Sequence, residues 1–189
     1  VGLLLNFKMD LGKLIEKFSV DALIDLNRNY QILSDEEVAA FNNTKLKALA
    51  SRPTRVCGMV RNEGKPGGGP FWINDNGTVT KQIIEKVQIS DDPNAQMIVK
   101  ESSHFNPVFI TVSKSDISGN KLDLDLFKDD SKYFVVTKSL KGMDVHYREL
   151  PGLWNGSMSN WNTIFVEIPS EVFSPVKTIN DLNKEAHQP

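Results

Sequence analysis

The chain has 189 residues, with 22 basic and 24 acidic side chains, so its formal net charge is −2. This near balance gives no general electrostatic attraction to nucleic acid or to an anionic membrane, and we expect neither partner. The 40% hydrophobic and 24% charged content is typical of a soluble globular protein, and the single cysteine, Cys57, excludes an intrachain disulfide or a multi-cysteine zinc site.

The first residues carry an amphipathic helical pattern, with apolar side chains recurring at spacings of three and four. We expect the chain to continue a longer gene product, because it opens within this pattern. A β-sheet that lacks strands from such an upstream region has an exposed edge. We therefore expect the chain to pair with the upstream region or with a second copy of itself. The apolar positions are Leu3, Leu4, Phe7, Leu11, Leu14, Ile15 and Phe18.

A second helical signal begins at Ser34, where Ser-Asp-Glu-Glu has the form of a capping box. The predicted helix carries Val38, Phe41 and further apolar residues, and it ends before Pro53. Two or three helices therefore fill residues 1–50. We expect residues 1–52 to form a helical segment.

From residue 53 onward, short apolar runs alternate with glycine, proline, asparagine and aspartate, which predicts strands and turns. Helices followed by strands favour an α/β or α+β fold with a mixed sheet and flanking helices over residues 53–189. We expect a tight turn at 75–77, a helical turn at 122–127 and a closing helix at 179–186. The predicted strands are 55–62, 81–90, 108–113, 133–139 and 163–168.

Residues 62–72 include three consecutive glycines, at 67–69. Such a segment lets backbone amides approach an anion closely. No helical pattern follows, so the phosphate-loop and dinucleotide-binding signatures are both absent. The segment is either a flexible hairpin between two strands or a loop that covers a ligand.

Glu85 falls inside the predicted strand 81–90, on the same face as Ile83 and Val87. A carboxylate in this apolar setting needs a hydrogen-bonding partner. It either accepts from ligand hydroxyls or pairs with an arginine or lysine.

His104 and Asn106 lie together at the entrance of the predicted strand 108–113. The histidine can act as an acid, as a base or as a hydrogen-bond donor to phosphate, or it can be structural. His104, His146 and His187 are widely spaced and form no Glu-x-x-His zinc pattern.

Residues 150–163 concentrate tryptophans and amides, Asn162 among them. This mixture suits sugars, which pack on indole rings while their hydroxyls bond to amides. The alternative is a surface loop with buried tryptophans.

Further along, Lys177 follows Pro175, and an ammonium held beside a rigid turn can neutralise a phosphate. The alternative there is a solvated lysine.

In this order, the segments over residues 55–182 resemble the C-terminal half of a UDP-sugar pyrophosphorylase, a family with a nucleotide-diphospho-sugar transferase fold. Residues 82–90, Gln-Ile-Ile-Glu-Lys-Val-Gln-Ile-Ser, are similar to the family's Q-V-V-E-Y-S-E-I-S stretch. Residues 173–177, Phe-Ser-Pro-Val-Lys, are similar to its F-x-P-[VL]-K segment. The amino-acid sequence is still more similar to a bacterial family of unknown function that is related to these enzymes.

The resemblance implies that the protein handles a sugar 1-phosphate and a nucleoside triphosphate, with Mg²⁺ bridging the phosphates. Lys177 would be the catalytic residue that contacts phosphate, and Glu85 would bind sugar hydroxyls. Gly58, His104 and Asn106 would line the sugar pocket. Gln88 stands where the family has a second glutamate, and Asn162 is a further candidate for substrate binding.

The sequence also departs from that family. The nucleotide-binding glycine loop and the metal-binding aspartate of the enzymes lie upstream of the matched region, so the metal ligands of this protein are unknown from its sequence, and the chain alone is expected to be inactive. Two alternatives stay open. One is a non-catalytic domain that binds a sugar or nucleotide, and the other is a structural or assembly domain. We expect a cytoplasmic location.

Overall fold

The computed structural model describes residues 1–62, 68–75, 77–150, 160–174, 176 and 178–188. The chain begins with a layer of helices: α1 (Gly2–Glu16), α2 (Val20–Tyr30), α3 (Asp35–Ala39) and α4 (Asn43–Ser51). The amphipathic prediction is confirmed, since α1 buries Leu4, Phe7, Leu11 and Leu14. No helix in the described part of the chain combines the length and apolar character needed to cross a membrane.

The expectation of two or three helices in residues 1–50 is wrong, because the described part of this region holds four. The capping box is confirmed: Ser34 Oγ accepts from the Glu37 amide, and Glu37 Oε2 accepts from the Ser34 amide, each at 3.2 Å. The helix that follows is split, however. Asn42 Oδ1 accepts from the Lys45 amide at 3.0 Å and starts α4 separately.

A mixed sheet of three strands lies beside the helices, and this confirms the α+β assignment. The central strand β1 (Thr54–Met59) pairs antiparallel with β4 (Phe109–Ser113) and parallel with β7 (Asn162–Glu167). These three strands agree with the predicted strands 55–62, 108–113 and 163–168.

Two antiparallel hairpins complete the strands of the described chain. The first joins β2 (Gly69–Asp75) to β3 (Thr78–Ile84) across the predicted turn, where the Gly77 amide donates to Asn74 Oδ1 at 2.8 Å. The second joins β5 (Phe134–Leu140), which was predicted, to β6 (Met143–Glu149), which was not.

Other elements differ from the predictions. The strand expected over 81–90 ends at Ile84 and continues as the 3₁₀ turn η1 (Lys86–Gln88), so Glu85 does not share a strand face with Val87. The α-helix α5 (Pro93–Lys100) was not expected. The helix expected at 179–186 is a pair of 3₁₀ turns, η5 (Ile179–Asn183) and η6 (Glu185–His187). Further 3₁₀ turns are η2 (Leu124–Phe127), which agrees with the predicted helical turn, η3 (Asp130–Lys132) and η4 (Ser170–Val172).

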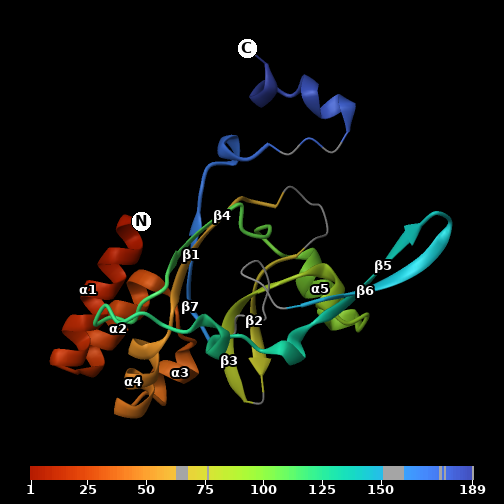
Figure 1. Ribbon diagram of the computed structural model, residues 1–189. Helices are drawn as coiled ribbons and strands as arrows, with labels where there is room; N and C mark the ends of the chain where they lie inside the picture. Colours follow the sequence, from red (N-terminus) through yellow and green to blue (C-terminus); the bar gives the residue numbers. More distant parts are fainter. Residues whose placement is uncertain (63–67, 76, 151–159, 175, 177, 189) are drawn as a thin grey trace.

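The body of the protein has three layers. The helices pack on one face of the mixed sheet, where Ile164 joins their apolar core. The β2–β3 hairpin packs on the opposite face, where Ile83 contacts the Cys57 and Met59 cluster. Figure 1 shows the β5–β6 hairpin and the C-terminal 3₁₀ turns extending away from this body.

Candidate functional site

The carboxyl ends of β1 and β7 lie at the same edge of the mixed sheet, because the two strands run parallel. The register pairs Met59 with Glu167 at this edge. In sheets with parallel strands, ligands bind outside the carboxyl ends. This edge is therefore where a functional site is expected.

Residues 102–108 run back along the continuation of β1 at this edge. The Phe105 amide donates to the Val60 carbonyl at 3.0 Å, and the Asn62 amide donates to the Ser103 carbonyl at 2.8 Å. These bonds place His104 opposite Arg61, with which it forms an isolated antiparallel bridge. The predicted histidine is thus held beside the end of β7.

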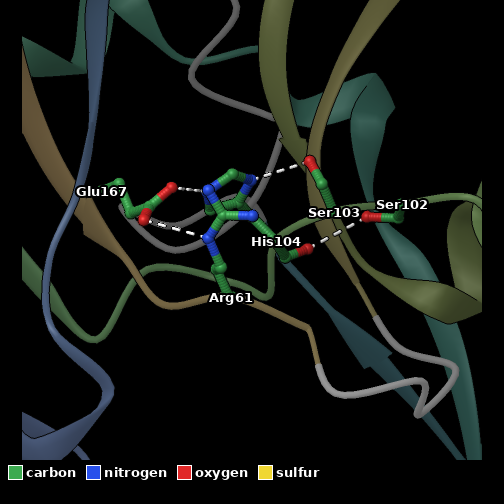
Figure 2. A network of polar contacts seen from close by, with 5 residues as sticks. All are labelled: Arg61, Ser102, Ser103, His104 and Glu167. Carbon is green, nitrogen blue, oxygen red and sulfur yellow. Dashed lines mark hydrogen bonds and ion pairs between the residues drawn. The ribbon is translucent and has the colours of Figure 1, made fainter.

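His104, Arg61 and Glu167 form one hydrogen-bonded network (Figure 2). Glu167 Oε1 accepts from Arg61 Nε, and Glu167 Oε2 lies 3.0 Å from His104 Nε2. On the other side of the ring, His104 Nδ1 lies 2.8 Å from Ser103 Oγ. Since an ionised carboxylate only accepts, a neutral His104 carries its proton on Nε2, and Ser103 donates to Nδ1.

The charges in this network favour the ionised carboxylate. The hydrogen bond from Arg61, and then that from His104, lowers the pKa of Glu167 below its ordinary value. The Arg61 side chain is exposed, so its guanidinium can also reach a ligand phosphate at this edge.

Glu85, Gln88 and Asn106 form a second cluster. Asn106 Nδ2 donates to Glu85 Oε1 at 2.9 Å, and the Glu85 amide donates to Gln88 Oε1 at 2.9 Å. The structure therefore brings together three of the predicted substrate-binding residues. The intrachain partner of Glu85 is this asparagine amide, and not the arginine or lysine that was the second alternative from the sequence.

Glycines let the chain pack directly on this cluster. A Cβ atom on Gly68 would lie 2.5 Å from the Ile84 carbonyl oxygen and 2.7 Å from Asn106 Oδ1. A Cβ atom on Gly69 would lie 2.6 Å from the His104 carbonyl oxygen. Any larger residue would force these atoms apart, so the glycines fix how closely β2 approaches residues 104–106.

One buried oxygen atom of the cluster lacks a hydrogen-bond donor. Asn106 Oδ1 is buried without a partner. Beside it lies the half-buried Glu85 carboxylate, which accepts from Asn106 Nδ2 through Oε1. Burial raises the pKa of Glu85, while the bond from Asn106 lowers it. The arrangement is a pair of adjacent acceptors that suits a ligand with hydroxyl donors.

The remaining predicted site residues lie elsewhere. Gly58 is on β1, and an added Cβ would lie 3.1 Å from Ile168 Cδ1, so that side chain covers it. Asn162 begins β7, at the opposite end from Glu167, and its Nδ2 donates to the Leu49 carbonyl at 2.8 Å. Lys177 lies outside the described residues, as do 63–67 of the glycine-rich segment and 151–159 of the tryptophan-rich one.

Sequence reasoning missed Arg61, Ser103 and Glu167. Arg61 and Glu167 lie near the ends of the predicted strands 55–62 and 163–168, where charged side chains are ordinary. The parallel pairing of β1 with β7 joins residues 108 positions apart and brings Glu167 to Arg61. The stretch that runs back along the continuation of β1 adds Ser103. No local pattern in the sequence contains that information.

The described residues do not provide a resident site for the Mg²⁺ that the resemblance implies. No group of three or more histidine, cysteine, aspartate or glutamate side chains gathers among them in a metal-binding arrangement. Mg²⁺ takes several oxygen ligands in near-octahedral geometry, often with substrate phosphates. We therefore assign no Mg²⁺ ligand among the described residues.

Comparison with known proteins gives one family. Residues 7–188 match the family described as "Domain of unknown function (DUF4301)", and the chain belongs to it. A search of curated proteins and a search of solved structures each returned no match.

Proposed function

We propose that this member of the DUF4301 family contributes the sugar-binding part of a nucleotidyltransferase-like protein that handles a sugar 1-phosphate and a nucleoside triphosphate. The sequence resemblance to UDP-sugar pyrophosphorylases supports the proposal. So does the gathering of Glu85, Gln88 and Asn106 into one cluster. The observation that carries it is the buried Asn106 Oδ1, which has no donor and belongs to the side chain that bonds to the half-buried Glu85 carboxylate.

In this proposal, neighbouring sugar hydroxyls donate to Glu85 and Asn106. A half-buried carboxylate binds such donors more strongly than a neutral acceptor does, because the bond is charge-assisted. His104 lies on the same segment as Asn106, with Arg61 opposite it. The exposed Arg61 guanidinium bonds to Glu167 through Nε, so its other N–H groups can donate to further oxygens of the ligand. Lys177 takes the phosphate charge, as the resemblance implies. The protein then accelerates transfer by positioning the groups and neutralising charge.

The first experiment measures binding of sugar 1-phosphates and nucleotide sugars to the 189-residue chain by calorimetry. We expect Glu85→Gln to weaken binding about tenfold or more, since hydrogen bonds to charged groups are among the strongest in proteins. Glu101→Gln is the matched control, because Glu101 is exposed and loses the same charge. Absence of binding, or equal effects of the two variants, would overturn the proposal.

A second experiment separates catalysis from binding. Pyrophosphate release is followed with a panel of sugar 1-phosphates and nucleoside triphosphates, for the full-length gene product and for its Lys177→Ala variant. Release that Lys177→Ala abolishes supports the enzyme. Binding without release by the full-length protein supports the alternative of a non-catalytic sugar- or nucleotide-binding domain, and contradicts a catalytic role for Lys177.

A further inference from the structure

A small open pocket of about 20 Å³ lies at the amino-terminal end of β7. This is roughly room for one water molecule or one phosphate oxygen. The pocket is separate from the cluster of Glu85, Gln88 and Asn106 proposed to bind the sugar. The register pairs Thr54 with Asn162 at this end and Met59 with Glu167 at the other. Five residue steps along a strand span about 17 Å. The pocket lies where the helical layer, the β2–β3 hairpin and the start of β7 meet.

The pocket walls carry two cations, Arg52 after α4 and Lys81 on β3. In the described part of the chain, neither a hydrogen bond nor an ion pair engages the Arg52 guanidinium. Lys81 Nζ donates to Gln31 Oε1 over a long 3.3 Å, and its charge otherwise faces aromatic rings. Both cations therefore have N–H groups that can donate to a ligand.

Two buried polar atoms at the pocket also lack partners. Trp161 is 3% exposed, and its indole Nε1–H has no acceptor. Asn162 is 3% exposed, and its Oδ1 has no donor, because the contacts to Leu49 and Thr54 use only Nδ2. Buried polar groups are nearly always satisfied, so unpaired groups at one pocket indicate a ligand.

The burial of the charges points the same way. Desolvation lowers the pKa of Arg52 and of Lys81, since the pocket takes both cations partly out of water. Glu37, also at the pocket, is too far from Arg52 for an ion pair and has a pKa raised by burial. With one carboxylate against two cations, the pocket keeps a net positive charge.

We propose that this pocket binds a phosphate group, held by Arg52, Lys81 and the Trp161 indole N–H. The guanidinium matches two phosphate oxygens at once, and the ammonium supplies a second charge. Asn162 Oδ1 accepts from a protonated phosphate oxygen or from a hydroxyl of a phosphate ester. The site is independent of the proposed sugar cluster, so either can fail while the other stands.

The test follows the indole N–H signal of Trp161 in ¹H–¹⁵N spectra of the 189-residue chain, identified by its loss in Trp161→Phe. Inorganic phosphate is titrated at constant ionic strength, with chloride as the reference. We expect a saturable shift. Arg52→Gln and Lys81→Gln should each weaken binding about tenfold or more. Lys47→Gln is the control and should leave phosphate binding unchanged. Lys47 is an exposed lysine on α4, the helix that ends just before Arg52.

Glu37→Gln provides an outcome that damage to the fold cannot imitate. The amide can still accept from the Ser34 amide, while the loss of negative charge should tighten phosphate binding. A parallel titration with glycerol 1-phosphate identifies the source. Tighter binding than inorganic phosphate indicates an ester, and equal or weaker binding indicates free phosphate. A shift no larger with phosphate than with chloride, or Glu37→Gln binding no tighter than the original, would overturn the site.

Discussion

The close approach of Gly68 to the Glu85 and Asn106 cluster makes a sharp prediction about stability. An added methyl group at this position would lie 2.5 Å from the Ile84 carbonyl oxygen, which is backbone and cannot rotate away. It would also lie 2.7 Å and 2.8 Å from the two terminal atoms of Asn106. Gly68→Ala therefore displaces β3 or the Asn106 side chain.

The size of the effect follows from the cost of overpacking, which is about 1–3 kcal/mol for an extra methyl group in a tight site. For a chain of this size, each 1 kcal/mol moves Tm by about 2–4 °C, so Tm should fall by roughly 2–12 °C. Displacing Asn106 also removes the bond that lowers the pKa of Glu85, so this pKa should rise further.

Gly12→Ala is the matched control for Gly68→Ala. Gly12 lies inside α1, and an added Cβ would meet no atom within 4 Å. Because glycine in a helix interior is less favourable than alanine by about 1 kcal/mol, this variant should be more stable than the original. Thermal and urea unfolding followed by circular dichroism measure both variants. If Gly68→Ala unfolds at or above the Tm of the original chain, the described packing of β2 on this cluster is refuted.

Three further substitutions test the electrostatics and the internal bonds. Burial raises the pKa of Glu85 above its ordinary value of 4.5. The folded state is therefore destabilised by ionised Glu85, and this destabilisation increases as pH rises from 4.5 through the folded-state pKa. Glu85→Gln should raise Tm at pH 7 and leave it unchanged below pH 4. The pKa of Glu167 is lowered from 4.5, so its contribution is present above that pH and is lost as pH falls through the folded-state pKa; Glu167→Gln should lower Tm at pH 7, and finding the same loss at pH 2 would contradict this. Asn162→Ala should cost about 1–3 kcal/mol in urea unfolding, because it leaves the buried Leu49 carbonyl unpaired, and a change below 0.5 kcal/mol (roughly the size of a surface substitution) would argue against that bond.

The elements that were predicted correctly have strong local signals. The spacing of Phe7, Leu11 and Leu14 indicates α1 because a helix repeats its face every three or four residues. The apolar runs around Val56 and Ile164 indicate β1 and β7, which are buried by the helices on one face. In these elements, local pattern and tertiary packing agree.

The elements that were missed have weak or competing signals. β2 opens with Gly69 and Pro70, residues that are rare inside strands, and only its pairing with β3 makes it a strand. β6 exposes most of its side chains, so no apolar face marks it. The strand predicted through Glu85 ends early, because the chain turns there and Gln88 Oε1 accepts from the Glu85 amide.

The candidate site was predictable in part. Glu85, Gln88, His104 and Asn106 were identified from residue type and order, and the structure places Glu85, Gln88 and Asn106 in one cluster. The arginine and glutamate that hold His104 were not, since their contacts depend on the parallel pairing of distant strands. The unpaired acceptor on Asn106 is likewise a property of the packed structure alone.

The most direct test of the proposed sugar site is a cycle that removes a ligand hydroxyl and the Glu85 carboxylate separately and together. Calorimetry compares a binding sugar 1-phosphate with its single deoxy analogues, for the original chain and for Glu85→Gln. We expect at least one deoxy analogue to bind the original chain about tenfold more weakly than the parent sugar, with most of this difference absent in Glu85→Gln. Equal losses in both chains for every analogue would show that no sugar hydroxyl contacts Glu85.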